Sequence, residues 1–124
     1  MNGQIKEWIA KADGDFTSAL REYRARKNPN YDSACFHAQQ CIEKYLKAVL
    51  IKNRIAFSKG HDLEILLDRC LAVYPLWEPM RDDMQLLTQY AVQFRYPGES
   101  ADKEEAGKAV AAMKRSLADI RRVL

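Results

Sequence analysis

Two histidines and one late arginine are the residues of this sequence best suited to acid–base or phosphate chemistry. His61 follows Gly60 and precedes Asp62, where a helix is expected to begin. It can bond to the helix backbone there, or it can act as an acid or base in a cleft. Its surroundings in the sequence favour the backbone bond.

His37 and Cys41 are four residues apart on one helix face, a spacing that can hold a metal ion. Two ligands do not make a site, and no second pair of this kind supports them. The sequence also contains no phosphate-binding glycine loop, zinc-protease motif, serine-hydrolase motif or EF-hand. We therefore expect no metal and no cofactor, and we interpret His37 as a satisfied core or interface side chain.

Tyr90, Arg95 and Tyr96 gather just before a Pro-Gly pair that ends a helix. An arginine at this position can bond to the last carbonyl groups of the helix. Together with two tyrosines it can instead bind an anion or a nucleotide. The residues favour neither interpretation over the other.

These side chains must be positioned by helices, because apolar residues recur at helical spacing and no strand pattern occurs. The stretch Ala34–Ile51 has one apolar stripe and a second, polar row of His37, Gln40, Lys44 and Lys47. We predict that this stretch is the most buried helix. Asn30 or Asp32 is expected to cap it, and it should end near Asn53.

The other predicted helices cover residues 4–25, 62–74, 80–95 with Pro79 in the first turn, and a last one capped by Ser100 or Asp102 that runs to Leu124. The fold class is then all-α: an antiparallel up-down bundle with four long helices and one short helix. With 124 residues, the chain is expected to form one domain over residues 1–124.

Composition sets limits on the cellular setting. No apolar run approaches the roughly 20 residues of a membrane span, and the first residues carry acids where a signal peptide is apolar. A cytoplasmic location without membrane contact is the expectation. The net charge of +3 neither demands nor excludes nucleic acid. Three cysteines without a CxxC pair are expected to be free, buried thiols.

The sequence resembles the HEPN-domain family over nearly its whole length. The similarity lies in the segments YDSACFHAQQ (31–40), EKYLKA (43–48), HDL (61–63), Leu66-Leu67, Tyr90 and RYP (95–97). The resemblance implies an up-down helical bundle and a homodimer whose two-fold axis runs beside a cleft. Proteins of this family resemble metal-independent ribonuclease toxins, or non-catalytic partners of a minimal nucleotidyltransferase encoded separately.

The ribonuclease motif of the family is an arginine followed, after four to six residues, by a histidine. Arg95 stands at the family position of that arginine, but no histidine follows it anywhere in the chain. Arg95 can supply charge for a phosphate, but no group near it in sequence can take up the 2′-hydroxyl proton. Arg54 and His61 satisfy the spacing in a different loop, and we interpret this match as coincidence.

The sequence therefore predicts a dimeric binding or accessory module that is not an enzyme, with a nucleotide or an RNA phosphate as ligand. Arg95, Tyr96 and Tyr90 would hold the ligand, and His37, Lys44 and Lys47 would line the cleft. A purely structural partner of a nucleotidyltransferase is another interpretation. The alternative is a ribonuclease toxin of a toxin–antitoxin system, which would use Arg95 with a displaced His37 or His61.

Overall fold

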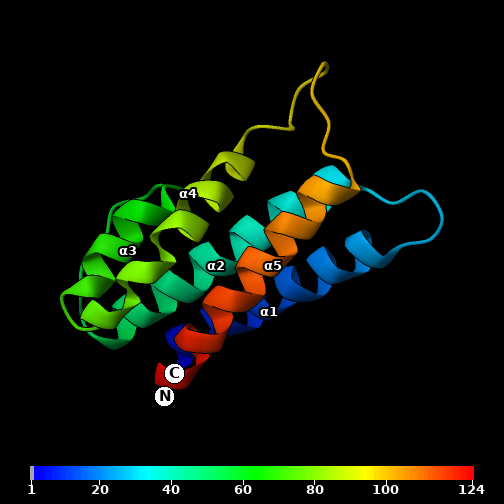
Figure 1. The fold of residues 1–124 in the computed structure, drawn as a ribbon. Coiled ribbons are helices and arrows are strands. Elements are labelled where there is room, and N and C mark those ends of the chain that lie inside the picture. Colours follow the sequence, from blue (N-terminus) through cyan, green and yellow to red (C-terminus); the bar gives the residue numbers. More distant parts are fainter. Residues whose placement is uncertain (1) are drawn as a thin grey trace.

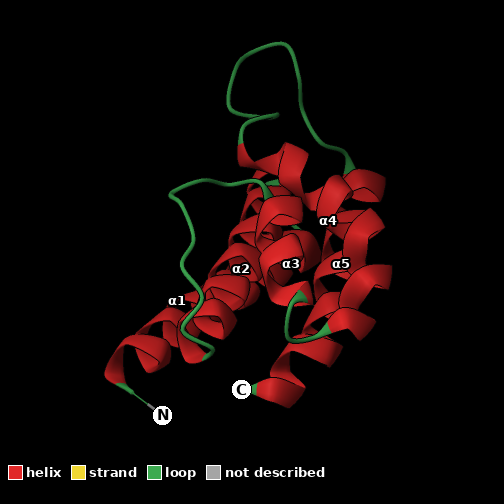
Figure 2. Ribbon diagram, turned by 90° about the vertical axis from the view of Figure 1, so that its left-hand side faces the viewer, coloured by secondary structure: helices red, strands yellow, loops and turns green. Residues whose placement is uncertain are grey.

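Helix α2 (Tyr31–Lys52) is the element on which the rest of the chain packs. The computed structural model describes residues 2–124, and all of their regular structure is helical (Figure 2). α2 contacts every other α-helix of this range, namely α1 (Gly3–Arg24), α3 (Leu63–Leu71), α4 (Arg81–Thr88) and α5 (Lys103–Ile120). The fold class predicted from the sequence, an all-helical bundle, is confirmed.

The helices follow an up-down order, in which α1 and α2 run antiparallel and α4 and α5 do the same (Figure 1). Three short 3-10 helices extend this frame: η1 (Pro75–Met80), η2 (Gln89–Ala91) and η3 (Arg121–Val123). Both ends of the described chain lie at one end of the bundle, and the segment that joins η2 to α5 projects from the opposite end (Figure 1). Within residues 2–124, no helix combines the length and hydrophobicity that a membrane span requires.

The apolar stripe of α2 forms the centre of the core, as its spacing predicted. Ile42, Leu46 and Leu50 are completely buried. More residues are buried on α2 than on any other helix of the described chain, 13 against 8 on α5. Burying an isoleucine or leucine side chain contributes about 1.5–3 kcal/mol, so this stripe supplies much of the energy of folding.

Short polar side chains begin the helices where the sequence indicated. Asn30 caps α2 by accepting the Ser33 amide at 2.9 Å, and Asp102 caps α5 by accepting the Glu105 amide at 2.8 Å. Asp62 does the same for α3 through the Glu64 amide, also at 2.9 Å. Each cap satisfies one amide that the helix itself leaves open. The cap of α2 is therefore Asn30 and not Asp32, and the cap of α5 is Asp102 and not Ser100.

The fourth helix is shorter than the predicted range 80–95. α4 ends at Thr88, η2 carries the chain to Ala91, and Val92 leaves helical geometry with φ −135°. The ring of Phe94 turns back to stack on Tyr90, with centroids 5.9 Å apart. Pro97 disfavours helical geometry at the residue before it. As a result, Arg95 lies in a turn and not on a helix.

The segment before α4 also differs from the prediction. α3 ends at Leu71, where the prediction extended it to Tyr74, and the amides of Val73 and Tyr74 both bond to the Cys70 carbonyl. Pro79 belongs to the 3-10 helix η1, whereas the sequence placed it in the first turn of an α-helix. Within residues 2–124 the bundle thus has three long and two short α-helices, where four long and one short were expected.

The three cysteines are free and buried, as expected. Burial raises the pKa of Cys35 and of Cys70 from 9.0 to about 12, and it raises the pKa of Cys41 as well. A thiol is nucleophilic only as the thiolate, so these three side chains serve as small apolar core residues at neutral pH.

We predict that Ile42→Asp unfolds the domain, at a cost of more than about 4 kcal/mol, because it buries an unpaired charge. Ile65 on α3 is 52% exposed, so Ile65→Asp is a matched control that should fold normally. Circular dichroism with urea unfolding measures both. A folded Ile42→Asp variant of near wild-type stability would contradict the central place of α2.

Candidate functional site

An open pocket lies where the start of α2 meets the segment after η2. It has a volume of about 370 Å³. The lining residues come from the start of α2, from η2 and from the segment after η2, and they are Asn30, Asp32, Ser33, Phe36, Tyr90, Phe94 and Arg95. We call it the Arg95 pocket. Because it borders the first turn of α2, it receives the positive end of that helix dipole, which favours an anion.

Two hydrogen bonds fix the walls of the Arg95 pocket. The buried Tyr90 donates its hydroxyl to Glu105 at 2.5 Å, and the Asp32 carboxylate accepts the Ala101 amide at 2.6 Å. Burial, together with the bond to Glu105, raises the pKa of Tyr90 well above its usual value. Tyr90 therefore stays protonated at neutral pH and positions the wall without serving as a base.

Arg95 supplies the positive charge of the pocket. Its guanidinium carbon lies 5.6 Å from the centroid of the Phe36 ring, a cation–π distance. The side chain is exposed, and within residues 2–124 it pairs with no carboxylate. By contrast, Arg81 contacts three carboxylates and Arg115 contacts one. The fork of N–H donors on Arg95 thus remains available for an oxyanion from outside.

His37 and Lys44, which were predicted to line the ligand cleft, face α1 instead. His37 Nδ1 is 2.8 Å from one carboxylate oxygen of Asp15, and Lys44 Nζ is 2.5 Å from the other. Asp15 is buried on α1. This cluster pairs a buried carboxylate with two cationic or polar groups and so holds α1 against α2.

Lys47 and His61 meet at a second buried carboxylate, Glu43. Lys47 Nζ is 3.1 Å and His61 Nδ1 is 2.7 Å from the two oxygens of Glu43, and Gln39 Nε2 donates to the same carboxylate at 3.0 Å. Lys47 also lies 5.6 Å from the Trp8 ring centroid. We call this set (Gln39, Glu43, Lys47 and His61) the Glu43 network. It ties the loop before α3 to the centre of α2.

The predicted site residues therefore occupy three places. Arg95 and Tyr90 line one pocket, while His37 and Lys44 share Asp15 and Lys47 joins the Glu43 network. Tyr96 is 72% exposed and does not line the pocket. Arg54, part of the coincidental Arg–His spacing, is exposed with φ 57°. Neither histidine lines the Arg95 pocket.

Several site residues were missed from the sequence. Gln39, Glu43 and Lys47 follow one another at intervals of four, a spacing at which helical side chains meet, so part of this network had a local signal. No local sequence signal placed Phe36 and Phe94 beside Arg95. The contact of Asp15 with His37 exists only because α1 packs on α2. Within residues 2–124, no group of three or more metal-ligating side chains is close enough to hold an ion.

The fold and the pocket define a small helical-bundle protein with an unpaired arginine over an aromatic ring at one end. The family model for the HEPN domain matches residues 5–123, and the chain belongs to the HEPN-domain family. This confirms the resemblance seen in the sequence.

Two solved structures share the fold. The crystal structure of TT1696 from Thermus thermophilus superposes with a TM-score of 0.84 at 23% identity, covering 99% of this chain and 100% of that one. The structure of ST0689, an archaeal HEPN homologue, has a TM-score of 0.69 at 24% identity and covers 95% of each chain. No curated protein matches the sequence.

We predict that Glu43→Gln destabilises the protein by about 3 kcal/mol, because it leaves the buried Lys47 ammonium without its counter-charge. Adding Lys47→Met should restore most of that stability. Glu104→Gln is the matched control, since its ion pair with Lys108 is exposed at a distance of 3.7 Å and should change little. Urea unfolding measures all four proteins, and equal effects of Glu43→Gln and Glu104→Gln would show that the Glu43 network is not a stability element.

Proposed function

We propose that this protein is a non-catalytic module that binds the phosphate of a nucleotide or of RNA through the Arg95 pocket. The observation that carries the proposal is the guanidinium of Arg95. It is unpaired within residues 2–124, stands over Phe36, and lies beside the first turn of α2. A phosphate there would meet the guanidinium of Arg95 and the helix dipole, and the Asp32 carboxylate at the pocket already accepts the Ala101 amide. A base could stack on the aromatic side chains.

The same pocket suits an accessory role. The substrates and products of a minimal nucleotidyltransferase carry phosphates, so a partner subunit of such an enzyme would use this kind of pocket. In both settings Arg95 binds and orients, because a guanidinium stays charged at any working pH and cannot accept a proton.

The test is binding of 5′-labelled single-stranded RNA and of a nucleoside triphosphate in EDTA, by fluorescence anisotropy and calorimetry. Arg95→Ala should weaken binding tenfold or more, since a hydrogen bond to a charged group contributes about 1.5–3 kcal/mol. Arg69 is exposed on α3 and serves as the matched control. If Arg69→Ala and Arg95→Ala have equal effects, the pocket is not the site.

One observation favours a second candidate, a metal-independent ribonuclease. His61 Nδ1 is held by the buried Glu43, while the side chain is 63% exposed. A carboxylate that orients a histidine is a common arrangement for a general base. Cleavage of RNA in EDTA that is lost both in Arg95→Ala and in His61→Ala or His37→Ala would establish this activity. Expression of the chain alone should then arrest growth.

We also propose that the protein acts as a homodimer. Val92 and Tyr96, on either side of Arg95 in the sequence, are 57% and 72% exposed, and apolar side chains of this size are enriched in homodimer interfaces. A dimer through this face would place the two Arg95 pockets near one another.

Light scattering at micromolar concentration should therefore give twice the chain mass of 14.3 kDa. The double variant Val92→Asp/Tyr96→Asp should be monomeric, because it places charges in the interface. Leu76→Asp is the control, since Leu76 is 90% exposed on η1. A monomeric wild-type protein would refute the dimer, and a monomeric Leu76→Asp variant would move the interface to η1.

A further inference from the structure

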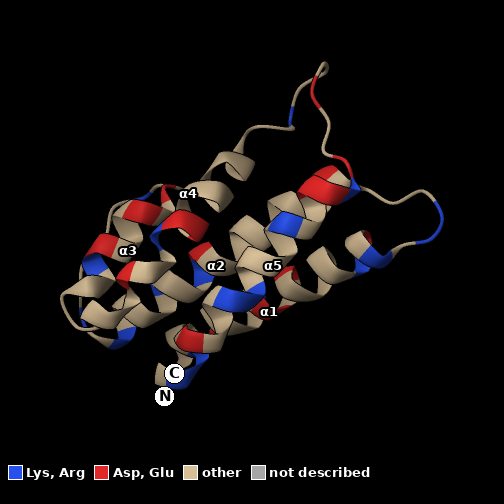
Figure 3. Ribbon diagram, in the orientation of Figure 1, with Lys and Arg blue, Asp and Glu red and all other residues tan. Residues whose placement is uncertain are grey.

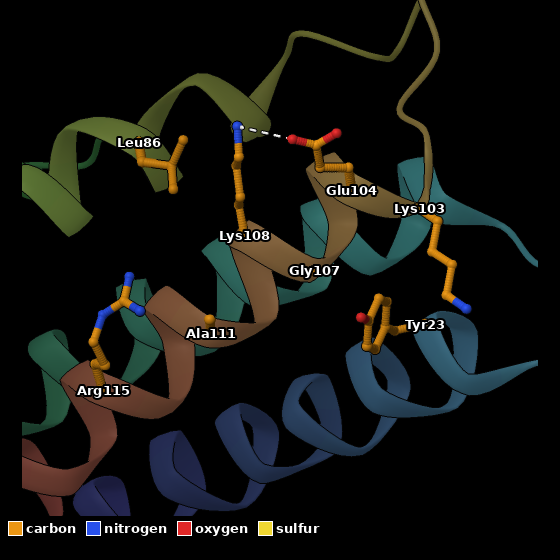
Figure 4. Close-up of a pocket in the computed structure, with 8 residues that line it drawn as sticks. All are labelled: Tyr23, Leu86, Lys103, Glu104, Gly107, Lys108, Ala111 and Arg115. Atoms are coloured by element: carbon orange, nitrogen blue, oxygen red, sulfur yellow. Dashed lines mark ion pairs between the residues drawn. The ribbon is translucent and has the colours of Figure 1, made fainter.

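A second, larger groove runs along the outer side of α5, between the last turn of α1 and α4 (Figure 4). Its volume is about 790 Å³. We call it the α5 groove, and its walls and charged edges are formed by Tyr23, Leu86, Lys103, Glu104, Lys108 and Arg115. None of its lining residues belongs to the Arg95 pocket or to the Glu43 network.

The floor of the groove is formed by α5 at positions with no side chain or only a methyl group. Gly107 and Ala111 are one turn apart on α5 and keep the floor low (Figure 4). A β-carbon on Gly107 would lie 3.1 Å from the hydroxyl oxygen of Tyr23, so the tyrosine ring rests directly against the helix backbone. A flat aromatic ring therefore stands at the side of a shallow channel.

Cations stand at both edges of the channel, Lys103 on the side of α1 and Lys108 and Arg115 on the side of α4 (Figure 4). Lys103, Lys108 and Arg115 span twelve residues of helix, a rise of about 18 Å. Lys103 pairs with no carboxylate within residues 2–124. Lys108 lies 3.7 Å from Glu104, with both side chains exposed, and such a pair holds the lysine weakly. Figure 3 shows further basic residues at the end of α1 and in the loop that follows it.

Arg115 is more firmly held than the two lysines. Its Nε and Nη2 atoms donate to the two oxygens of Asp83 at 3.1 and 2.9 Å. Nη1 has no partner among the described residues and can still donate to a phosphate. Glu104, which lines the groove, and Asp83, which holds Arg115, thus both lie next to cations.

We propose that the α5 groove binds the sugar–phosphate backbone of a single-stranded nucleic acid, with Tyr23 as the stacking surface for a base. Cations spaced along a channel beside an aromatic ring are how single strands are bound without sequence preference. An acidic protein segment fits less well, because the shallow floor has no deep apolar pocket for an anchoring side chain. The inference deepens the proposed function, on which it rests for the class of ligand.

The test is fluorescence anisotropy with labelled twelve-nucleotide oligouridylate and its DNA counterpart over a series of salt concentrations. The double variant Lys103→Glu/Lys108→Glu should weaken binding at least tenfold at low salt. It should also lower the slope of log K against log salt by about 1.4, the value for two phosphate contacts on a single strand. Lys11→Glu/Lys59→Glu, at two exposed positions outside the groove, is the charge-matched control. Circular dichroism verifies that each variant is folded.

The outcomes separate the two sites. Loss of oligonucleotide binding in the groove variant but not in Arg95→Ala supports the groove and contradicts the Arg95 pocket. Loss of binding in Arg95→Ala but not in the groove variant overturns the proposal for the α5 groove and supports the Arg95 pocket. Equal losses in the groove variant and its charge-matched control overturn the groove, because they indicate a general charge effect. Competition by polyglutamate as strong as by oligouridylate also overturns it, in favour of an acidic protein partner.

Discussion

A carboxylate buried in a protein needs partners that replace its water, and α2 brings two such carboxylates into the bundle. It carries Glu43 itself, and its polar row receives Asp15 from α1. Removing one partner from a buried charge costs several kcal/mol, whereas the complete set is close to balanced. The relative placement of α1, α2 and the loop before α3 therefore depends on the polar side chains of α2 as much as on its apolar stripe. A slip of α1 by one turn would leave His37 and Lys44 without Asp15.

This requirement divides the cationic side chains of the protein into two groups. His37, Lys44 and Lys47 face internal carboxylates, and a ligand could recruit them only by displacing Asp15 or Glu43. Arg95 stays free of such partners within residues 2–124, because the chain leaves helical geometry at Val92 and the guanidinium then lies over the Phe36 ring and not beside a carboxylate. The cations on the long seam between α1 and α2 are therefore neutralised, whereas Arg95 and the lysines of the α5 groove are among those that can still meet a phosphate.

The sequence was sufficient for the features that depend on neighbours along the chain. Helical periodicity identified α1, α2 and α5. Short polar residues indicated the starts of α2 (Asn30 or Asp32), α3 (Asp62) and α5 (Ser100 or Asp102). Features that depend on contacts between different helices could not be predicted from the sequence. The early end of α4 depends on Phe94 packing against Tyr90, and the use of His37 depends on Asp15, 22 residues away. Arg95 and Tyr90, which the sequence grouped, line one pocket, but their grouping with His37, Lys44 and Lys47 assumed one open face on α2.

Residues 92–100 form the tip of the molecule, and the hydrogen bond between the Asp32 carboxylate and the Ala101 amide makes this tip a closed loop. The bond between Tyr90 and Glu105 fastens the other side, so residues 92–100 leave and rejoin the bundle at fixed points. Loop-closure entropy changes slowly with length, by about 0.6 kcal/mol for each doubling. Insertions and deletions within residues 97–100 should therefore change the stability of the bundle little. Selection can act on the tip separately from the core, which gives one scaffold the means to serve different ligands.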